Sequence, residues 1–338
     1  MKKNKILVTG GLGFIGSHTV VELQKEGFDV IIIDDLSNTR LEVLDGIEAI
    51  SKVKPEFVKM DLKEKNSVSS FFSNHDIDGV IHFAASKAVG ESVEQPLKYY
   101  ENNIATLVYL LKSMTDNAVP HIIFSSSCTV YGQADELPIT ENATVKKAES
   151  PYGNTKQIGE EIIQDTAKVT DLSAIALRYF NPIGAHESAL IGELPLGVPQ
   201  NLIPFVTQTA AGIREELSVF GDDYPTADGT AVRDYIHVVD LAKAHISALK
   251  RLLEGINKSK MEFFNVGTGK GSSVLEVINA FEKVNQIEVK HKIVERREGD
   301  ITSAYANTEL ANKELGWQAE LSLEEALASA WQWQLKHK

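Results

Sequence analysis

The stretch KILVTGGLGFIG, residues 5–16, joins a short apolar run to three glycines at regular spacing. The apolar run indicates a strand buried on both faces, as in a parallel sheet. Gly10, Gly13 and Gly16 follow it directly, and a helical pattern from Ser17 to Glu26 comes next. In this context the glycines permit a tight turn, close approach of backbone amides to a pyrophosphate, and close helix–strand packing. The stretch predicts a dinucleotide-binding turn; the alternative is a glycine-rich turn that holds no ligand.

Strand-like apolar runs continue along the first 180 residues, with helical patterns between several of them. The runs are DVIIID (29–34), EFVKMD (56–61), GVIHFAA (79–85), HIIFSSS (121–127) and SAIALRYF (173–180). The clearest helical patterns lie around 97–114 and 152–169. This alternation predicts an α/β fold with a Rossmann-type, doubly wound parallel sheet.

The pattern changes after residue 181. Residues 182–234 are richer in glycine, proline and polar residues, and 270–338 is mixed α/β. Two later runs, DYIHVVD (234–240) and EFFNVG (262–267), read as strands that return to the first domain. We therefore expect a dinucleotide-binding domain at 1–181 plus about 235–267. A smaller, interleaved mixed α/β substrate domain is expected at 182–234 and 268–338.

Composition limits the classes of partner. The 338 residues carry a net charge of −13, which disfavours nucleic acid and anionic membrane as general partners. The N-terminal apolar run is too short for a signal peptide, and no run approaches the roughly 20 residues of a membrane span. With one cysteine, Cys128, an internal disulfide is impossible. The nine histidines show no metal-site spacing, so we expect no metal and a cytoplasmic protein.

Asp34 ends the second predicted strand, 24 residues after Gly10. A carboxylate at this position accepts hydrogen bonds from both hydroxyls of an adenosine ribose and repels a 2′-phosphate. Asp35 adds a second negative charge, so the sequence predicts NAD(H) over NADP(H). Asp61, at the end of the third strand, is placed to reach the adenine, with a turn residue as the alternative.

The segment SPYGNTK, residues 150–156, places Tyr152 and Lys156 on one helix face. A free phenol has a pKa near 10, and a lysine ammonium together with a positive nicotinamide ring favours the phenolate. Ser127 follows the strand HIIFSS at the carboxyl end, where open α/β sheets bind ligands. The set predicts a proton-transfer site, with a surface Tyr–Lys pair as the alternative.

The glycine spacing, taken with Ser127, Tyr152 and Lys156, resembles the extended short-chain dehydrogenases/reductases. In that superfamily the tyrosine transfers the proton, the lysine lowers the tyrosine's pKa and holds the nicotinamide ribose, and the serine or threonine bonds the reacting oxygen. Longer segments resemble the UDP-glucose 4-epimerase family over nearly the whole chain. They are VTGGLGFIGSHT, VIHFAASKAVGESV, FSSSCTVYG, SPYGNTK, LRYFNPIGAH, DGTAVRDYIHVVDLA and RREGD.

The resemblance implies interconversion of UDP-glucose and UDP-galactose through a 4-keto sugar, with an NAD that does not leave. It also implies a place in galactose metabolism and a homodimer, for which the helices at 97–114 and 152–169 can each expose a face. The implied cofactor residues are Gly10, Gly13, Phe14, Ile15, Gly16, Asp34, Asp35, Asn38, Asp61, Leu62, Phe83, Ala84, Lys87, Asn102, Ser125, Tyr152, Lys156 and Tyr179. The implied substrate residues are Lys87, Ser127, Tyr152, Asn181, Asn201, Leu202, Phe220, Arg233, Arg297, Asp300 and Ala304.

Within the substrate set, Arg233 and Arg297 can form bidentate contacts with the diphosphate. By resemblance, Phe220 lies beside the uracil, and Asn181 and Asn201 bond the phosphates. For each of them the alternative is a residue that stabilises a loop.

Ala304, just before Tyr305, matches the family position that borders the sugar's 2-substituent. A small side chain there leaves room for an N-acetyl group, which predicts that UDP-N-acetylhexosamines are also epimerised. The alternative is that Ala304 merely packs under Tyr305.

Three other functions remain open from the sequence. A nucleotide-sugar 4,6-dehydratase is disfavoured because its relatives carry Asp-Glu after the Thr of the Ser-Thr segment, whereas Val130 and Tyr131 follow Thr129 here. A uronate epimerase or decarboxylase needs a positive partner for C6. A non-catalytic NAD-sensing protein could dispense with the Tyr–Lys pair.

Overall fold

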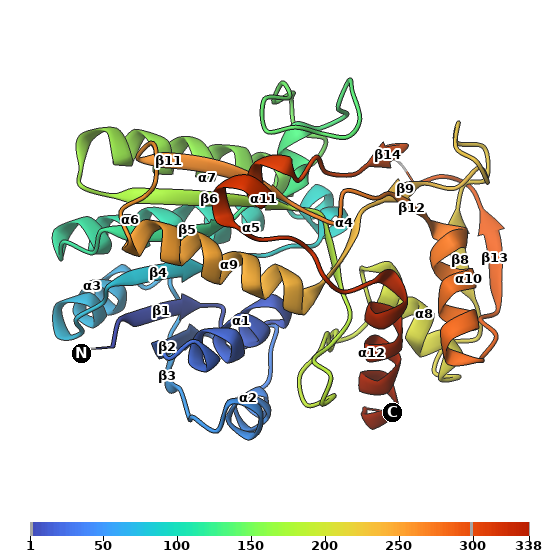
Figure 1. Ribbon diagram of the computed structural model, residues 1–338, viewed down its shortest axis with the longest axis horizontal. Helices are drawn as coiled ribbons and strands as arrows, with labels where there is room; N and C mark the ends of the chain where they lie inside the picture. The colour runs from blue at the N-terminus through green and yellow to red at the C-terminus, as the bar shows by residue number, and fades with distance from the viewer. Residues whose placement is uncertain (1–2, 298–299, 338) are drawn as a thin grey trace.

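The computed structural model describes residues 3–297 and 300–337. Among them, seven parallel strands form one sheet in the order β11-β6-β5-β4-β1-β2-β3 (Figure 1). They are β1 (Lys5–Thr9), β2 (Asp29–Asp34), β3 (Glu56–Lys59), β4 (Gly79–His82), β5 (His121–Ser125), β6 (Ser173–Tyr179) and β11 (Met261–Val266). The predicted Rossmann-type parallel sheet is confirmed.

Helices connect these strands and cover both faces of the sheet. The α-helices are α1 (Phe14–Lys25), α2 (Val43–Ser51), α3 (Lys65–Asn74), α4 (Val89–Glu94), α5 (Pro96–Tyr100), α6 (Thr106–Asp116), α7 (Pro151–Val169), α8 (Leu202–Ala210), α9 (Val238–Leu253), α10 (Val274–Asn285), α11 (Glu309–Leu315) and α12 (Leu323–Lys336). A π-helical turn, η1 (Glu101–Ala105), joins α5 to α6, and a 3-10 turn, η2 (Cys128–Tyr131), follows β5.

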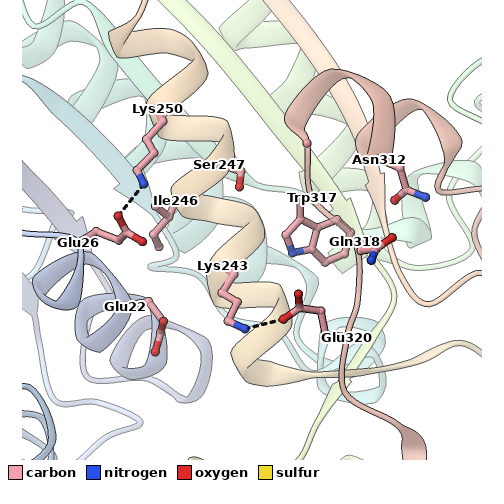
Figure 2. A pocket seen from close by; sticks show the side chains of 11 residues that line it. Glu22, Glu26, Lys243, Ile246, Ser247, Lys250, Asn312, Trp317, Gln318 and Glu320 are labelled. Carbon is pink, nitrogen blue, oxygen red and sulfur yellow. Dashed lines mark hydrogen bonds and ion pairs between the residues drawn. The ribbon is translucent and has the colours of Figure 1, made fainter.

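Helices α1 and α9 pack side by side, and a cavity of about 460 Å³ opens between them and the segment before α12 (Figure 2). Both lysines that line it are paired. Lys243 lies 3.0 Å from Glu320, and Lys250 lies 2.6 Å from Glu26. The positive charges of both lysines at this cavity are therefore paired with glutamates of the protein itself.

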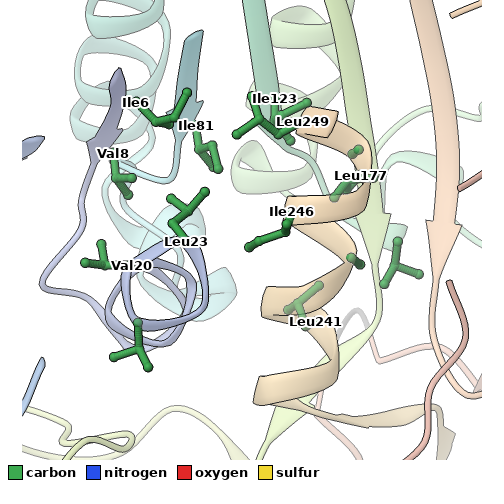
Figure 3. Close-up of a cluster of buried hydrophobic side chains, with 14 of the residues drawn as sticks. Ile6, Val8, Val20, Leu23, Ile81, Ile123, Leu177, Leu241, Ile246 and Leu249 are labelled. Atoms are coloured by element: carbon green, nitrogen blue, oxygen red, sulfur yellow. The ribbon is translucent and has the colours of Figure 1, made fainter. Parts of the chain in front are cut away.

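One hydrophobic core lies between these two helices and the face of the sheet that they cover (Figure 3). The side chains of Ile6 and Val8 point into this core. The side chain of Leu7, between them, points into the core on the opposite face, which is formed with α3, α6 and α7. This alternation follows from the period of two along a strand. Each fully buried aliphatic side chain contributes roughly 1.5–3 kcal/mol, so apolar burial on both faces fixes the sheet.

The remaining elements gather beyond the end of the sheet opposite the N-terminus (Figure 1). Their own core includes residues of α8, α10 and α12, packed with the two-stranded sheet of β8 (Leu217–Phe220) and β13 (His291–Val294). The other short strands are β7 (Asn181–Ile183), β9 (Val232–Arg233), β10 (Tyr235–His237), β12 (Ser272–Ser273) and β14 (Ser303–Ala304). We call this group the substrate lobe, after the role that the sequence predicts for it.

Three local predictions differ from the structure. The strand predicted at 234–240 is wrong beyond residue 237, because the His237 side chain accepts a hydrogen bond from the Val239 N–H and caps α9. Its short strand β10 pairs with β7, outside the main sheet. The first helix begins at Phe14, earlier than predicted, and the helix predicted at 97–114 is divided by η1.

None of the helices in the described part of the chain is both long and apolar enough to span a membrane.

Candidate active site

The glycine turn between β1 and α1 has no room for side chains. Gly10 has φ +69°, and a Cβ built on it would lie 2.8 Å from the Ala84 nitrogen. A Cβ on Gly16 would lie 2.3 Å from the Gly10 oxygen. Gly13 is the N-cap of α1 and places no side chain over the first turn, so no capping side chain takes its N–H groups. This leaves the positive end of the helix open to an anion.

A cleft of about 860 Å³ opens in front of this turn, beside the carboxyl ends of the central strands. All eighteen residues predicted to bind the cofactor line it, from Gly10 to Tyr179. The structure therefore brings together residues from the ends of six parallel strands, β1 to β6, or the loops that follow them, with others from α7. Such a position is where open α/β sheets hold their ligands.

Asp34 lies at the end of β2 and is only 6% exposed. Its carboxylate accepts hydrogen bonds from the Leu12 and Leu36 N–H groups, at 3.2 and 3.0 Å, and from the Thr39 hydroxyl at 3.0 Å. Burial raises the pKa of Asp34, while these bonds oppose that rise. Arg40 lines the same cleft, a residue that the sequence reasoning did not weigh.

Asp61 also lines the cleft, and its carboxylate accepts the Lys63 N–H at 2.8 Å. This bond is the one expected of a turn residue. The adenine contact thus stays a prediction.

Helix α7 carries the predicted Tyr–Lys pair at its start. Ser150 caps the helix by accepting the Gly153 N–H, and Pro151 occupies its first turn. Tyr152 and Lys156 are both buried and share a face, with the lysine Nζ 5.8 Å from the tyrosine ring centroid. The predicted common face is confirmed.

The segment after β5 meets this face of α7. The Lys156 Nζ donates to the Ser125 carbonyl at 2.6 Å, and the Ser127 hydroxyl lies beside the Tyr152 phenol, where it acts to lower the pKa of the phenol. The Ser125 and Tyr179 hydroxyls also bond to each other. The phenol of Tyr152 and the ammonium of Lys156 thus line one end of the cleft, and the Ser127 hydroxyl lies beside the phenol.

Burial dominates the acid–base properties of this group. It raises the pKa of Tyr152, and the hydrogen bond from Ser127 only partly opposes the rise. Burial also lowers the pKa of Lys156 to about 8, while Glu160 raises it. The protein's own groups therefore keep the phenol protonated, and Lys156 does not bring its pKa toward neutrality by itself.

Three side chains behind the pair were missed by the sequence reasoning. The Ser126 hydroxyl donates to Glu160 Oε1 at 2.6 Å, and Arg178 binds both oxygens of the same carboxylate. Glu160 lies four residues after Lys156, so the helical spacing that paired Tyr152 with Lys156 also pointed to it. Ser126 and Arg178 carried no comparable signal.

The substrate lobe gathers four of the residues implied by the resemblance. Arg297 lies 3.0 Å from Asp300, and Arg233 lies 3.8 Å from the same carboxylate. The Arg297 guanidinium stacks 4.7 Å from the centroid of the Phe220 ring. Two cations and an aromatic face thus lie together, although Glu298 and Gly299 of the same motif are outside the described residues.

Glu193 links Lys87 to Asn201 by hydrogen bonds. Its Oε1 accepts from the Lys87 Nζ at 3.2 Å and from the Asn201 amide at 2.7 Å. Leu202 follows Asn201 as the first residue of α8. Glu193 was missed because its glycine- and proline-rich segment has no periodicity.

The other substrate predictions lie apart from the cofactor cleft. Asn181 begins β7 and donates its backbone N–H to the Asp234 carbonyl at 2.9 Å. Ala304 pairs with Arg233 between β14 and β9 and is 2% exposed, in a buried cluster with Val130 and Tyr131. Val130 and Tyr131, the two residues after Thr129, are therefore packed in this core.

Neither a metal site nor a reactive thiol emerges at the site. Within 3–297 and 300–337, no group of three or more His, Cys, Asp or Glu side chains is arranged to hold a metal ion. Burial raises the pKa of the Cys128 thiol to about 12, so this neighbour of Ser127 stays protonated.

Comparison with known proteins agrees with this geometry. A family model described as GDP-mannose 4,6 dehydratase matches residues 7–330. A UDP-glucose 4-epimerase from Haemophilus influenzae is 48% identical over 330 residues, covering 97% of each chain.

Two solved structures are similar throughout. UDP-glucose-4-epimerase from Stenotrophomonas maltophila, with bound NAD and formylated UDP-arabinopyranose, has a TM-score of 0.95 and 47% identity, covering 99% of each chain. The enzyme from Bifidobacterium longum, in complex with NAD+ and UDP, has a TM-score of 0.94 and 46% identity, covering 98% of each chain. The chain belongs to the UDP-glucose 4-epimerase family of the extended short-chain dehydrogenases/reductases.

Proposed function

We propose that this chain interconverts UDP-galactose and UDP-glucose by reversible oxidation at C4 of the sugar, using bound NAD. The observation that carries the proposal is that Tyr152 and Lys156 line one end of the glycine-turn cleft, with Ser127 beside the phenol. A phenol and a hydroxyl that lie side by side can both reach one sugar oxygen.

The cleft fits a dinucleotide. The open first turn of α1 suits a pyrophosphate, and Asp34 is placed for the hydroxyls of the adenosine ribose. When bound there, NAD supplies the acceptor and donor of the C4 hydride. Asp34 and Asp35 favour this cofactor over one with a 2′-phosphate.

The chain's own residues handle the proton. Because the protein's own groups keep Tyr152 protonated, its phenolate would form once the positive charge of the bound cofactor adds to that of Lys156. The phenolate takes the proton from O4 of the sugar as C4 is oxidised, and returns it after the 4-keto sugar has presented its other face. Ser127 donates to the same oxygen and polarises it. Lys156, buried and fixed on the Ser125 carbonyl, holds the nicotinamide ribose and supplies positive charge beside the phenol.

The substrate lobe anchors the nucleotide and leaves the sugar free to turn. Arg233 and Arg297 bind the diphosphate in exchange for part of their contact with Asp300. Phe220 lies beside the uracil, and Asn181, Asn201 and Leu202 close around the phosphates. A firmly held nucleotide with few contacts to the hexose is what rotation of the keto sugar requires.

Further proposals accompany this one, and the first concerns the domains. The NAD-binding domain comprises 1–181 with about 235–267, and the substrate domain comprises 182–234 with 268–338. We also propose that the enzyme acts in the cytoplasm, in galactose metabolism.

It also forms a homodimer, supported by exposed apolar side chains on α4, α5 and α6. Leu97 is 81% exposed, and Val93 and Val108 are exposed near it along the chain. A second copy that packs its own α5–α6 and α7 against this face would cover them.

The small side chain of Ala304 supports acceptance of UDP-N-acetylglucosamine and UDP-N-acetylgalactosamine. Its test compares kcat/KM for UDP-galactose and UDP-N-acetylgalactosamine in the native enzyme and in Ala304→Tyr. We expect the native enzyme to use both and the variant to lose the acetylated substrate. If kcat/KM of the native enzyme is more than about 10³-fold lower for UDP-N-acetylgalactosamine than for UDP-galactose, the difference in transition-state free energy exceeds about 4 kcal/mol. The proposal that Ala304 leaves the pocket open would then be rejected.

The decisive experiment for the main activity is incubation of the purified protein with UDP-galactose, without added NAD, followed by sugar analysis. We expect UDP-glucose with no net accumulation of NADH. If no UDP-glucose forms even with NAD added, the proposal fails. A 4-keto-6-deoxy product would instead identify a dehydratase.

A further inference from the structure

Three consecutive serines at the end of β5 each meet α7, at three successive turns of the helix. The Ser125 carbonyl accepts from Lys156, the Ser126 hydroxyl donates to Glu160, and the Ser127 hydroxyl lies beside the Tyr152 phenol. The helical partners 152, 156 and 160 are spaced by four residues and so share one face. The contacts of Ser125 and Ser127 are to Lys156 and Tyr152, which take part in proton transfer. The contact of Ser126 is to Glu160, which lies farther along α7.

The third contact ends in a buried ion pair. Arg178 on β6 binds both oxygens of Glu160, at 2.9 Å through Nε and 2.6 Å through Nη2, and its Nη1 donates to the Tyr131 hydroxyl at 3.0 Å. Both charged side chains are less than a tenth exposed. A buried pair is weak evidence for stability, because desolvation offsets most of the Coulomb attraction, so its location calls for another reason.

Ser126 is the link between this pair and the reacting group. Its side chain is fully buried, and its N–H donates to the Leu177 carbonyl at 3.0 Å. Any displacement of Ser126 moves the carbonyl before it and the hydroxyl after it. These are the atoms that hold Lys156 and Tyr152.

We propose that the Arg178–Glu160 pair is a positioning device that acts through Ser126 to fix Tyr152, Lys156 and Ser127 for proton transfer. The inference rests on the proposed epimerase activity for its kinetic readouts. It makes Glu160, Ser126 and Arg178 positioning residues, since none of them is placed to touch the sugar.

The pair also has an electrostatic effect on Lys156. The titratable groups that interact with this lysine are Glu160 and Tyr152 on α7 and His82 on β4. Burial keeps His82 neutral by lowering its pKa to about 3. Glu160 is the group that raises the pKa of Lys156 against burial. Without its charge, Lys156 should lose its proton at a lower pH.

A second buried pair provides a matched control. Arg251 on α9 binds both oxygens of Glu262 on the neighbouring strand β11, at 2.7 and 3.0 Å, and Glu314 joins them. Like the first pair, it links a helix to a strand of the main sheet. None of its members lines the cofactor cleft or contacts the serine segment.

The test compares Ser126→Ala, Glu160→Gln and Glu262→Gln with the native holoenzyme. For Ser126→Ala, which leaves the ion pair intact, we expect kcat to fall about tenfold because the catalytic groups lose their fixed position, with KM nearly unchanged and Tm lowered no more than in Glu262→Gln. For Glu160→Gln we expect the alkaline limb of the kcat profile to move about one pH unit lower. Glu262→Gln should lower Tm and leave kcat and the pH profile as in the native enzyme.

A readout independent of turnover accompanies the kinetics. Acetylation of Lys156 by acetic anhydride, followed by mass spectrometry across pH, reports when this amine loses its proton. Its midpoint should fall by about one unit in Glu160→Gln and stay unchanged in Glu262→Gln.

The outcomes separate the two proposals. If the native enzyme does not epimerise UDP-galactose, the proposed function is rejected. The pH midpoint of Lys156 acetylation then still tests the role of the ion pair, because it does not depend on turnover. Suppose that the native enzyme is active, that Ser126→Ala keeps full kcat, and that Glu160→Gln shifts neither the pH profile of kcat nor the pH profile of Lys156 acetylation. The Arg178–Glu160 pair then has only a structural role. Should Glu160→Gln fail to fold, the kcat of Ser126→Ala decides alone.

Discussion

Asp34 and Lys156 in the cofactor cleft are buried and bonded to the backbone, whereas Arg297 and Asp300 in the substrate lobe are more exposed and bonded to each other. Asp34 accepts two backbone N–H groups, and Lys156 donates to a backbone carbonyl. Arg297 has a side chain 55% exposed and pairs with Asp300, and Phe220 is 37% exposed. The first set keeps its geometry whether or not a ligand is present, while the second must exchange partners to bind one.

This difference suits the proposed chemistry. A cofactor that stays bound gains from groups already in place, because their ordering cost is met when the protein folds. A substrate that binds, turns and leaves gains from exposed groups that can re-pair. The predictions below test the contrast, from the largest effect to the smallest.

The largest effect is expected at Tyr152. Tyr152→Phe removes the hydroxyl that moves the proton and keeps the ring that packs in the cleft, so kcat should fall by about 10²–10⁴-fold. Bound NAD, measured after acid extraction, should remain at the native level. Retained turnover would remove Tyr152 from the mechanism, and loss of NAD would show that the phenol also holds the cofactor.

In the substrate lobe, Arg233→Ala should raise KM for UDP-galactose by about tenfold to a hundredfold, the effect of removing a charged hydrogen bond. NAD content should not change. Arg296→Ala is the control, because this neighbouring arginine pairs with Asp223 and stacks on Tyr224. Equal effects of the two variants would mean that general positive charge, and not the position of Arg233, binds the diphosphate.

In the cofactor cleft, Asp34→Ala should weaken NAD binding by roughly tenfold and reduce discrimination against NADP, since two accepted hydroxyl bonds and a repulsive charge are lost. Arg40 remains in the same part of the cleft to meet a 2′-phosphate. Competition titration with both cofactors measures this. An unchanged NAD preference would assign the selectivity to Asp35 instead.

The smallest effect is expected far from both regions. Lys168 pairs with Asp165 at 2.8 Å on the exposed side of α7, with both side chains mostly in solvent. Lys168→Ala should change Tm by less than about 2 °C, because exposed pairs contribute little, and should leave kcat and KM at native values. A clear loss of activity would mean that α7 transmits surface changes to Tyr152, and the contrast between buried and exposed groups would no longer hold.

The sequence predicted the parts of the fold and site that follow a local rule. Apolar runs gave the strands of the main sheet, the glycine spacing gave the turn before α1, and the four-residue spacing gave the shared face of Tyr152 and Lys156. The strand at 234–240 was predicted too long because valines favour strands in general, whereas the His237 cap starts a helix there.

Contacts between distant segments could not be predicted in this way. Glu193 meets Lys87 across 106 positions of sequence, and Ser126 meets Glu160 only because β5 ends beside α7. The pKa of Tyr152 was also beyond reach, since its direction depends on burial, which the spacing of residues does not report.

The position of β11 in the main sheet has a consequence for how the protein is made. This last strand pairs with β6, yet it begins at Met261, long after β6 ends at Tyr179. Ribosomes add about 5–20 residues per second, so β6 leaves the ribosome several seconds before the strand that covers its edge. An open, apolar strand edge is a template for pairing with another nascent chain. Translation pauses or truncations between these two strands should therefore promote aggregation more than similar events after Val266.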